Sequence, residues 1–125
     1  MLSNTDAVAT VAVKNLDTAR KFYEEKLGLK AANTTDGEVI TYTTGGARLN
    51  VYRSQYAGTN KATAVTWTVG NEFDRTLQEL KSKGVTFEHY DMPGLTLEGD
   101  VHRHGDMKVA WFKDPDGNIL NIVNQ

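Results

Sequence analysis

The sequence has no cysteine, only 2 prolines and no apolar run long enough to cross a bilayer. The lack of cysteine excludes disulfides, thiolate metal ligands and a cysteine nucleophile together. Lysine and arginine number 14 against 16 aspartates and glutamates, the net charge is −2, and the basic residues are scattered singly. This pattern predicts no binding to nucleic acid or to an anionic membrane. We therefore expect an untargeted, cytoplasmic protein with neither kind of partner.

What the chain does contain is an internal repeat within 125 residues, of which 39% are hydrophobic. The repeated phrases are VATVAVKNLDTARKFYEEKLGL and ATAVTWTVGNEFDRTLQELKSKGV, and GGARLNV matches DGNILNI near the end of each half. The positions that match at one constant offset are Val13 and Val69, Asn15 and Asn71, and Gly28 and Gly84. A duplicated unit can bury its apolar face against its copy. A chain of this length supports one core, so we predict a single domain over residues 1–125.

Hydrophobic periodicity predicts a strand followed by a helix in both halves. Alternation of apolar with small or polar side chains indicates a strand whose buried face consists of Val65, Trp67 and Val69. The helix after it is expected to begin at Asn71 as N-cap and to end at Gly84, with Phe73, Leu77 and Leu80 on its apolar stripe. The first half predicts a matching helix that begins near Asn15 and ends at Gly28.

Further strands are predicted after each helix, at residues 30–34, 38–43 and 47–53, then 85–89, 107–113 and 118–124. Glycine turns separate them at Asp36-Gly37, Gly45-Gly46 and Pro115-Asp116-Gly117. The pattern predicts an α+β fold of two βαβββ modules, residues 7–53 and 63–124. Their strands are expected to form a curved mixed sheet, a cup with the helices on its outer face.

The sheet face that the helices leave open is the predicted ligand site. Strand alternation assigns to it Val8, Thr10, Ala12, Arg48, Asn50, Tyr52, Ala64, Thr66, Thr68, Ile119, Asn121 and Val123. Small, hydroxyl, amide and aromatic groups of this kind are typical of a ligand pocket. The alternative is that this face packs against a second subunit or against the other half of the chain.

One segment, residues 90–106, breaks the symmetry of the repeat and is rich in glycine, acidic residues and histidine. An insertion in one copy of a repeat is a candidate functional loop, and a solvated surface loop is the alternative. We expect His102 and His104 to contact ligand or solvent from this loop. A relocated metal site is a further alternative, in which the two histidines are joined by Glu98, Asp100 or Asp106.

Two phrases carry a resemblance to a known family: N-L-D-x-A-x-x-F-Y-x-x-x-L-G-L at Asn15 to Leu29, and F-K-D-P-D-G-N-I-L at Phe112 to Leu120. With the paired modules, they resemble the vicinal oxygen chelate superfamily, which includes glyoxalase I, extradiol dioxygenases and the fosfomycin and bleomycin resistance proteins. The resemblance implies metal ligands at four positions, which here are Val8, Asn50, Ala64 and Asn121. Valine and alanine have no donor atom, and neutral asparagine is a poor ligand for a transition metal. We therefore expect no metal and no other cofactor.

The predicted function is metal-independent binding of an amphipathic or aromatic small molecule, similar to that of the bleomycin resistance branch. The predicted ligand-binding residues are Thr10, Arg48, Asn50, Tyr52, Thr66, His102, His104, Trp111 and Asn121. The two asparagines occupy equivalent places in the repeat and suit a polar ligand, or else they bond to each other or to backbone. Aromatic candidates for stacking on the ligand are Tyr42, Tyr52, Tyr56 and Trp111.

The resemblance also implies a homodimer, and three other functions remain open. One is a lyase or dioxygenase with relocated metal ligands. Another is a metal-free isomerase or cyclase in which Asp100, His104 or Tyr52 acts as general acid or base. The last is a structural module without chemistry of its own.

Overall fold

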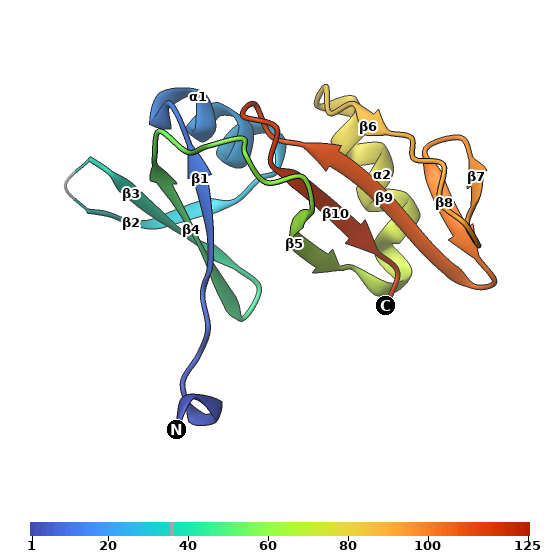
Figure 1. The fold of residues 1–125 in the computed structure, drawn as a ribbon, viewed down its shortest axis with the longest axis horizontal. Coiled ribbons are helices and arrows are strands. Elements are labelled where there is room, and N and C mark those ends of the chain that lie inside the picture. The colour runs from blue at the N-terminus through green and yellow to red at the C-terminus, as the bar shows by residue number, and fades with distance from the viewer. Residues whose placement is uncertain (36) are drawn as a thin grey trace. The chain divides into compact units, whose positions relative to one another are not determined.

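The computed structural model describes residues 1–35 and 37–125, so the predicted Asp36-Gly37 turn lies partly outside the described residues. Two compact units, Met1–Thr59 and Asn60–Gln125, divide the chain (Figure 1). Each unit has a helix and a mixed sheet, which confirms the predicted α+β class. Within the described ranges, no helix is long and apolar enough to cross a membrane.

The first unit contains a four-stranded sheet in the order β1-β4-β3-β2. Its elements are η1 (Leu2–Asn4), β1 (Ala9–Val13), α1 (Leu16–Arg20), the π-helical turn η2 (Lys21–Lys26), β2 (Lys30–Thr35), β3 (Val39–Thr44) and β4 (Ala47–Arg53). Strand β1 runs parallel to β4, and the other neighbours are antiparallel. The predicted strand and helix positions are therefore confirmed in this half.

The helix of the first unit begins as its sequence predicts. The backbone N–H of Thr18 donates to Asn15 Oδ1 over 3.0 Å, which caps the first turn. Ala19, Phe22 and Tyr23 are buried, and the chain leaves the helix through Gly28 at a φ of 75°. The widened π turn of η2 is a feature that the periodicity did not predict.

Tyr42 belongs to the core of this unit, so its predicted role in ligand stacking is wrong. Its side chain is fully buried and stacks on Tyr23 at 6.0 Å between ring centres. Its hydroxyl donates to Glu24 Oε2 over 2.8 Å, and Arg20 pairs with the same carboxylate. Burial and the Glu24 hydrogen bond raise the pKa of the Tyr42 hydroxyl far above its usual range.

The second unit contains a larger sheet in the order β5-β10-β9-β8-β7, with β6 paired to β9. Its elements are β5 (Thr63–Thr68), η3 (Gly70–Glu72), α2 (Phe73–Ser82), β6 (Phe87–Glu88), β7 (Thr96–Glu98), β8 (Val101–His104), β9 (Met107–Lys113) and β10 (Ile119–Val123). Strand β5 is parallel to β10 and lies at the edge of the sheet. Helix α2 covers one face of this sheet (Figure 1).

The helix α2 buries the predicted stripe of Phe73, Leu77 and Leu80. Trp67 stacks on buried Phe112 at 6.4 Å, on the sheet face where it was expected, although its side chain is only half-buried. The predicted N-cap is wrong, because the 3₁₀ turn η3 takes up residue 71 and Glu72 flanks the helix without a side-chain cap. The predicted stop at Gly84 is confirmed by its φ of 88°.

The asymmetric segment 90–106 is largely a hairpin and not the loop that the composition predicted. Strands β7 and β8 pair in antiparallel register, and β8 pairs in turn with β9. Backbone pairing to β9 therefore extends the sheet, and the tight turns are made by Gly99 and Gly105, whose φ values are 63° and 59°.

The phrase D-P-D-G-N between β9 and β10 builds a turn around one buried carboxylate. Asp114 is 5% exposed, and its Oδ1 accepts from the backbone N–H groups of Asp116 and Asn118, each over 2.9 Å. Its Oδ2 accepts from Asn118 Nδ2 over 2.8 Å. Gly117 has a φ of 87°, which a residue with a side chain rarely adopts. This phrase therefore has a structural role in setting the β9–β10 register.

Candidate functional site

Three aromatic rings meet on the second sheet, on the face opposite α2. The ring of Trp111 lies 5.5 Å from that of Tyr90 at 77° and 4.8 Å from that of His102 at 84°. Residues along β9 alternate between faces, and Lys108 at one parity reaches Asp74 on α2, so Trp111 at the other parity points away from the helix. These three residues form what we call the aromatic cluster.

A pocket of about 470 Å³ opens over the aromatic cluster, within the second unit. It is lined by Lys61, Ala62, Thr63, Tyr90, Asp91, Met92, Trp111 and Ile119. Its volume falls in the usual range for small-molecule sites. The floor comes from the sheet strands, and one wall comes from the segment after β6.

A local irregularity in the pairing of β5 with β10 sets the edge of this pocket. Ile119 pairs with Thr63 and Leu120 pairs with Val65, so one residue of β5 is skipped. The Trp111 Nε1–H donates to the Thr63 hydroxyl over 3.0 Å, which fixes the orientation of the indole. The predicted strand alternation did not place Thr63 on this face, and the bulge brings it there.

His102 is fully buried on β8, so of the two roles expected for it, contact with ligand or with solvent from a loop, the solvated loop residue is wrong. Its Nε2 accepts from the backbone N–H of Tyr90 over 2.9 Å, which requires that the ring proton sit on Nδ1. The histidine thereby holds the start of the 90–92 wall against the sheet. His104, two residues along β8, is exposed, and its Nδ1 lies 2.9 Å from the Gly94 carbonyl oxygen.

Three buried side-chain atoms have no hydrogen-bond partner among the residues that the structure describes: the Tyr90 hydroxyl, His102 Nδ1 and Asn121 Oδ1. All three residues neighbour Trp111, the first two by ring contact and Asn121 as its partner across β9 and β10. Leaving a buried polar atom unpaired costs about 1 to 3 kcal/mol. These unpaired polar atoms therefore belong to residues around Trp111, which lines the pocket. Burial is the main cause that raises the pKa of the Tyr90 hydroxyl, which keeps it protonated as a donor.

The predicted ligand-binding residues fall into two groups, one in each unit. Of the predicted ligand-binding residues, only Trp111 lines the pocket. His102 and Asn121 lie beside Trp111. Thr66 is exposed on β5. The members in the first unit are Thr10, Arg48, Asn50 and Tyr52.

The first-unit members share the open face of their sheet, as strand alternation predicts, while Leu49 and Val51 are buried on the other face. Asn50 Oδ1 accepts from the Thr41 hydroxyl over 2.7 Å, so this amide is already bonded within its own sheet. Tyr52 is 37% exposed.

Sequence reasoning missed most of the pocket wall. Residues 90–92 begin the segment 90–106, which the sequence marked as a candidate functional loop, but they were not named individually because they follow a two-residue strand and have no periodicity that could assign them to a face. Thr63 was missed because a β-bulge is not visible in an alternating pattern. Ile119 was predicted on this face, and the pocket confirms its position.

The relocated metal site has no support in the geometry of its candidate residues. Nε2 of His102 is engaged by Tyr90, His104 contacts a backbone carbonyl, and Glu98 pairs with Arg103 at 3.1 Å. Within the described ranges, no group of three or more His, Cys, Asp or Glu side chains could hold a metal ion.

Asp100, proposed from the sequence as an acid or base, belongs to an ion-pair network. Its two carboxylate oxygens lie 2.8 Å from Lys81 Nζ and 2.7 Å from His89 Nε2. The hydrogen bond from Lys81, and then that from His89, hold the pKa of this carboxyl below its ordinary value of 3.8. A carboxylate held in this way is a weak base, which disfavours the proposed role.

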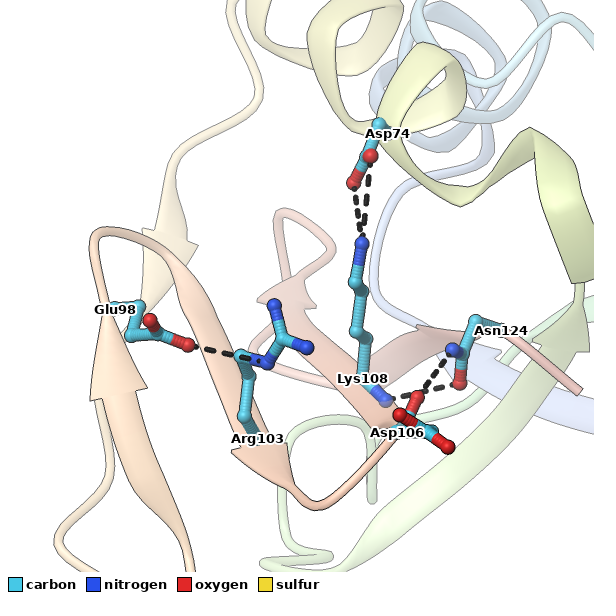
Figure 2. Close-up of polar contacts among 6 residues, drawn as sticks. All are labelled: Asp74, Glu98, Arg103, Asp106, Lys108 and Asn124. Carbon is cyan, nitrogen blue, oxygen red and sulfur yellow. Dashed lines mark hydrogen bonds and ion pairs between the residues drawn. The ribbon is translucent and has the colours of Figure 1, made fainter.

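A smaller pocket of about 150 Å³ lies on the α2 side, and its charges are paired (Figure 2). Lys108 Nζ lies 3.2 and 3.4 Å from the carboxylate oxygens of Asp74 and 5.9 Å from the centre of the Phe73 ring. Arg103 Nε lies 3.1 Å from Glu98. Two cations and two carboxylates neutralise each other here, so this pocket presents no net charge to a ligand.

Comparison with protein families places the fold and its site in context. The family model for the glyoxalase/bleomycin resistance protein/dioxygenase superfamily matches residues 6–122. The chain belongs to this superfamily. A comparison with curated proteins finds no match.

Solved structures of the superfamily share the fold at low sequence identity. A glyoxalase/bleomycin resistance protein/dioxygenase from Alicyclobacillus acidocaldarius is 23% identical with a TM-score of 0.71, and the match covers 96% of this chain and 90% of that one. A lactoylglutathione lyase from Agrobacterium tumefaciens is 16% identical, with a TM-score of 0.70 and coverage of 96% and 92%. The fosfomycin resistance protein FosX from Mesorhizobium loti is 10% identical, with a TM-score of 0.69 and coverage of 100% and 94%. These superfamily members show the shared fold, and the lyase and resistance names belong to those proteins.

The four residues at which the resemblance implies metal ligands do not fit a divalent metal. Val8 and Ala64 offer no donor atom. The amide oxygen of Asn50 is taken by the Thr41 hydroxyl. Asn121 retains a free buried oxygen, but one neutral oxygen does not make a metal site.

Proposed function

We propose that this superfamily member binds an amphipathic or aromatic small molecule without a metal, in the pocket over Trp111. The single observation that carries the proposal is the combination of an apolar, aromatic pocket of about 470 Å³ with a set of expected metal-ligand positions in which Val8 and Ala64 have no donor atom. Because the metal positions do not fit, the proposal includes no lyase or dioxygenase step.

The pocket lining supports a ligand that is mostly apolar with a few polar groups. Trp111, Tyr90, Met92 and Ile119 provide apolar surface, and the indole is held by its hydrogen bond to Thr63. An immobilised aromatic side chain binds a flat ligand without losing further side-chain freedom. The polar groups of the lining come from Lys61, Thr63 and Asp91.

The test is ligand binding measured by calorimetry and by tryptophan fluorescence. Trp67 lies on the opposite sheet face, so a Trp67→Phe variant leaves Trp111 as the one reporter. We expect small aromatic probes, such as para-cresol and indole, to change the Trp111 emission and to lose affinity in Trp111→Ala. Trp67→Phe serves as the matched control and should bind as the parent does.

Metal independence is tested with the same titration. Affinity should be unchanged by EDTA and by added Zn²⁺, Ni²⁺ or Fe²⁺. Tight binding of one such ion per chain, together with a lyase or dioxygenase activity, would overturn the proposal.

We also propose a cytoplasmic homodimer, as the resemblance implies, and sedimentation equilibrium of the purified protein tests the dimer.

A further inference from the structure

Two charged side chains of opposite sign line the pocket over Trp111. They are Lys61 and Asp91, and both are exposed to solvent. Neither forms a hydrogen bond or an ion pair with any residue in the described part of the chain, and they do not pair with each other. The charged smaller pocket differs, because both of its cations are paired with carboxylates (Figure 2).

The two charges come from opposite sides of the pocket floor. Lys61 precedes β5, whereas Asp91 follows Tyr90 in the segment that leaves β6 beside β9. Strand β10 separates β5 from β9 in the sheet (Figure 1). Strand β6 pairs with β9 on the edge away from β10, so β5 and β6 are three strand spacings, about 14 Å, apart, and the pocket has a basic side, an apolar middle and an acidic side.

The acidic side also has aromatic surface that attracts cations. Tyr90 directly precedes Asp91, and its ring meets that of Trp111 at 77°, so the two rings form a corner. The faces of Tyr and Trp rings attract ammonium groups, and a nearby carboxylate adds to this attraction. The basic side, near Lys61, has the small residues Ala62 and Thr63.

From this arrangement we infer that the ligand is a zwitterion with an apolar or aromatic middle. Its ammonium group lies at Asp91 and the Tyr90–Trp111 corner, and its carboxylate or other anionic group lies at Lys61. The inference rests on the proposed function, since it names the class of ligand for the same pocket.

The test uses three related probes that differ only in their charged ends. para-(Aminomethyl)phenylacetic acid has both charges, para-ethylbenzylamine lacks the carboxylate, and para-tolylacetic acid lacks the ammonium group. Each is titrated into the protein and into the variants Asp91→Asn and Lys61→Gln, all in the Trp67→Phe background. Both substitutions are at exposed positions, so the fold should be retained, and circular dichroism checks this.

We expect the zwitterion to bind the parent protein more tightly than either singly charged probe. Asp91→Asn should lower the affinity for the zwitterion and for the amine by about threefold to tenfold, and it should leave the affinity for para-tolylacetic acid unchanged. Lys61→Gln should lower the affinity for the zwitterion and for para-tolylacetic acid by a smaller factor, about twofold to fivefold, and it should leave the affinity for the amine unchanged.

Three results would overturn the inference. Equal binding of all three probes, or equal effects of both variants on every probe, would show that the charged groups of the probes do not contribute to affinity, while the pocket would still bind small molecules. If none of the three probes binds, the inference is wrong, and the titrations with para-cresol and indole decide separately whether the pocket binds a ligand.

Discussion

Replacing His102 by alanine is expected to lower the free energy of unfolding by about 3 to 4 kcal/mol. The imidazole is fully buried and packs at 4.8 Å on the Trp111 ring, so its removal leaves a cavity that costs about 2 to 3 kcal/mol. The Tyr90 backbone N–H, which donates to Nε2 over 2.9 Å, loses its acceptor, and this adds about 1 kcal/mol.

The measurement is urea unfolding followed by Trp111 fluorescence in the Trp67→Phe background, which reports on the second unit. His102→Gln restores an acceptor for the Tyr90 N–H and should lose only about 1 to 2 kcal/mol. His104→Ala is the matched control, because His104 lies on the same strand but is exposed, and it should lose less than about 1 kcal/mol.

A loss below about 1 kcal/mol in His102→Ala would refute this reasoning, as would losses that are equal for both alanine variants. Such a result would mean that His102 contributes no more to packing and hydrogen bonding than an exposed strand residue. It would also remove the argument that His102 positions the 90–92 wall of the pocket.

Three further substitutions test other parts of the fold. Asp114→Ala removes a buried carboxylate that accepts three hydrogen bonds, so thermal and urea unfolding should show a loss of about 2 to 4 kcal/mol. Asn124→Ala removes the acceptor of the Lys108 backbone N–H and the donor to the Asp106 carbonyl (Figure 2), and should cost about 1 to 2 kcal/mol in the same assay. The lowered pKa of Asp100 means that its contribution is present above its ordinary pKa of 3.8 and is lost as the pH falls through the folded-state value. Unfolding measured from about pH 5 to pH 2 should therefore show the parent losing its stability advantage over Asp100→Asn, and a constant difference would contradict the assignment.

Local patterns in the sequence predicted the helices and strands of each half because the start and end of these elements depend on neighbouring residues. The cap at Asn15 needs only the N–H of Thr18, and the stop at Gly84 needs only a residue that tolerates positive φ. The cap predicted at Asn71 was wrong, because a 3₁₀ turn takes up that position before α2 begins at Phe73. The hairpin in segment 90–106 was missed because its strand β8 is held in the sheet by pairing with β9. A local pattern within the segment does not show this pairing.

The sequence by itself determined the α+β class, the repeated order of elements, the faces of the main strands and the absence of donors at Val8 and Ala64. Each of these follows from residue identity or from a period of two or 3.6 residues. Only the tertiary structure decided where the pocket lies. The bulge that presents Thr63, the burial of His102 and the wall at residues 90–92 all depend on contacts between segments far apart in the chain, which no local period records.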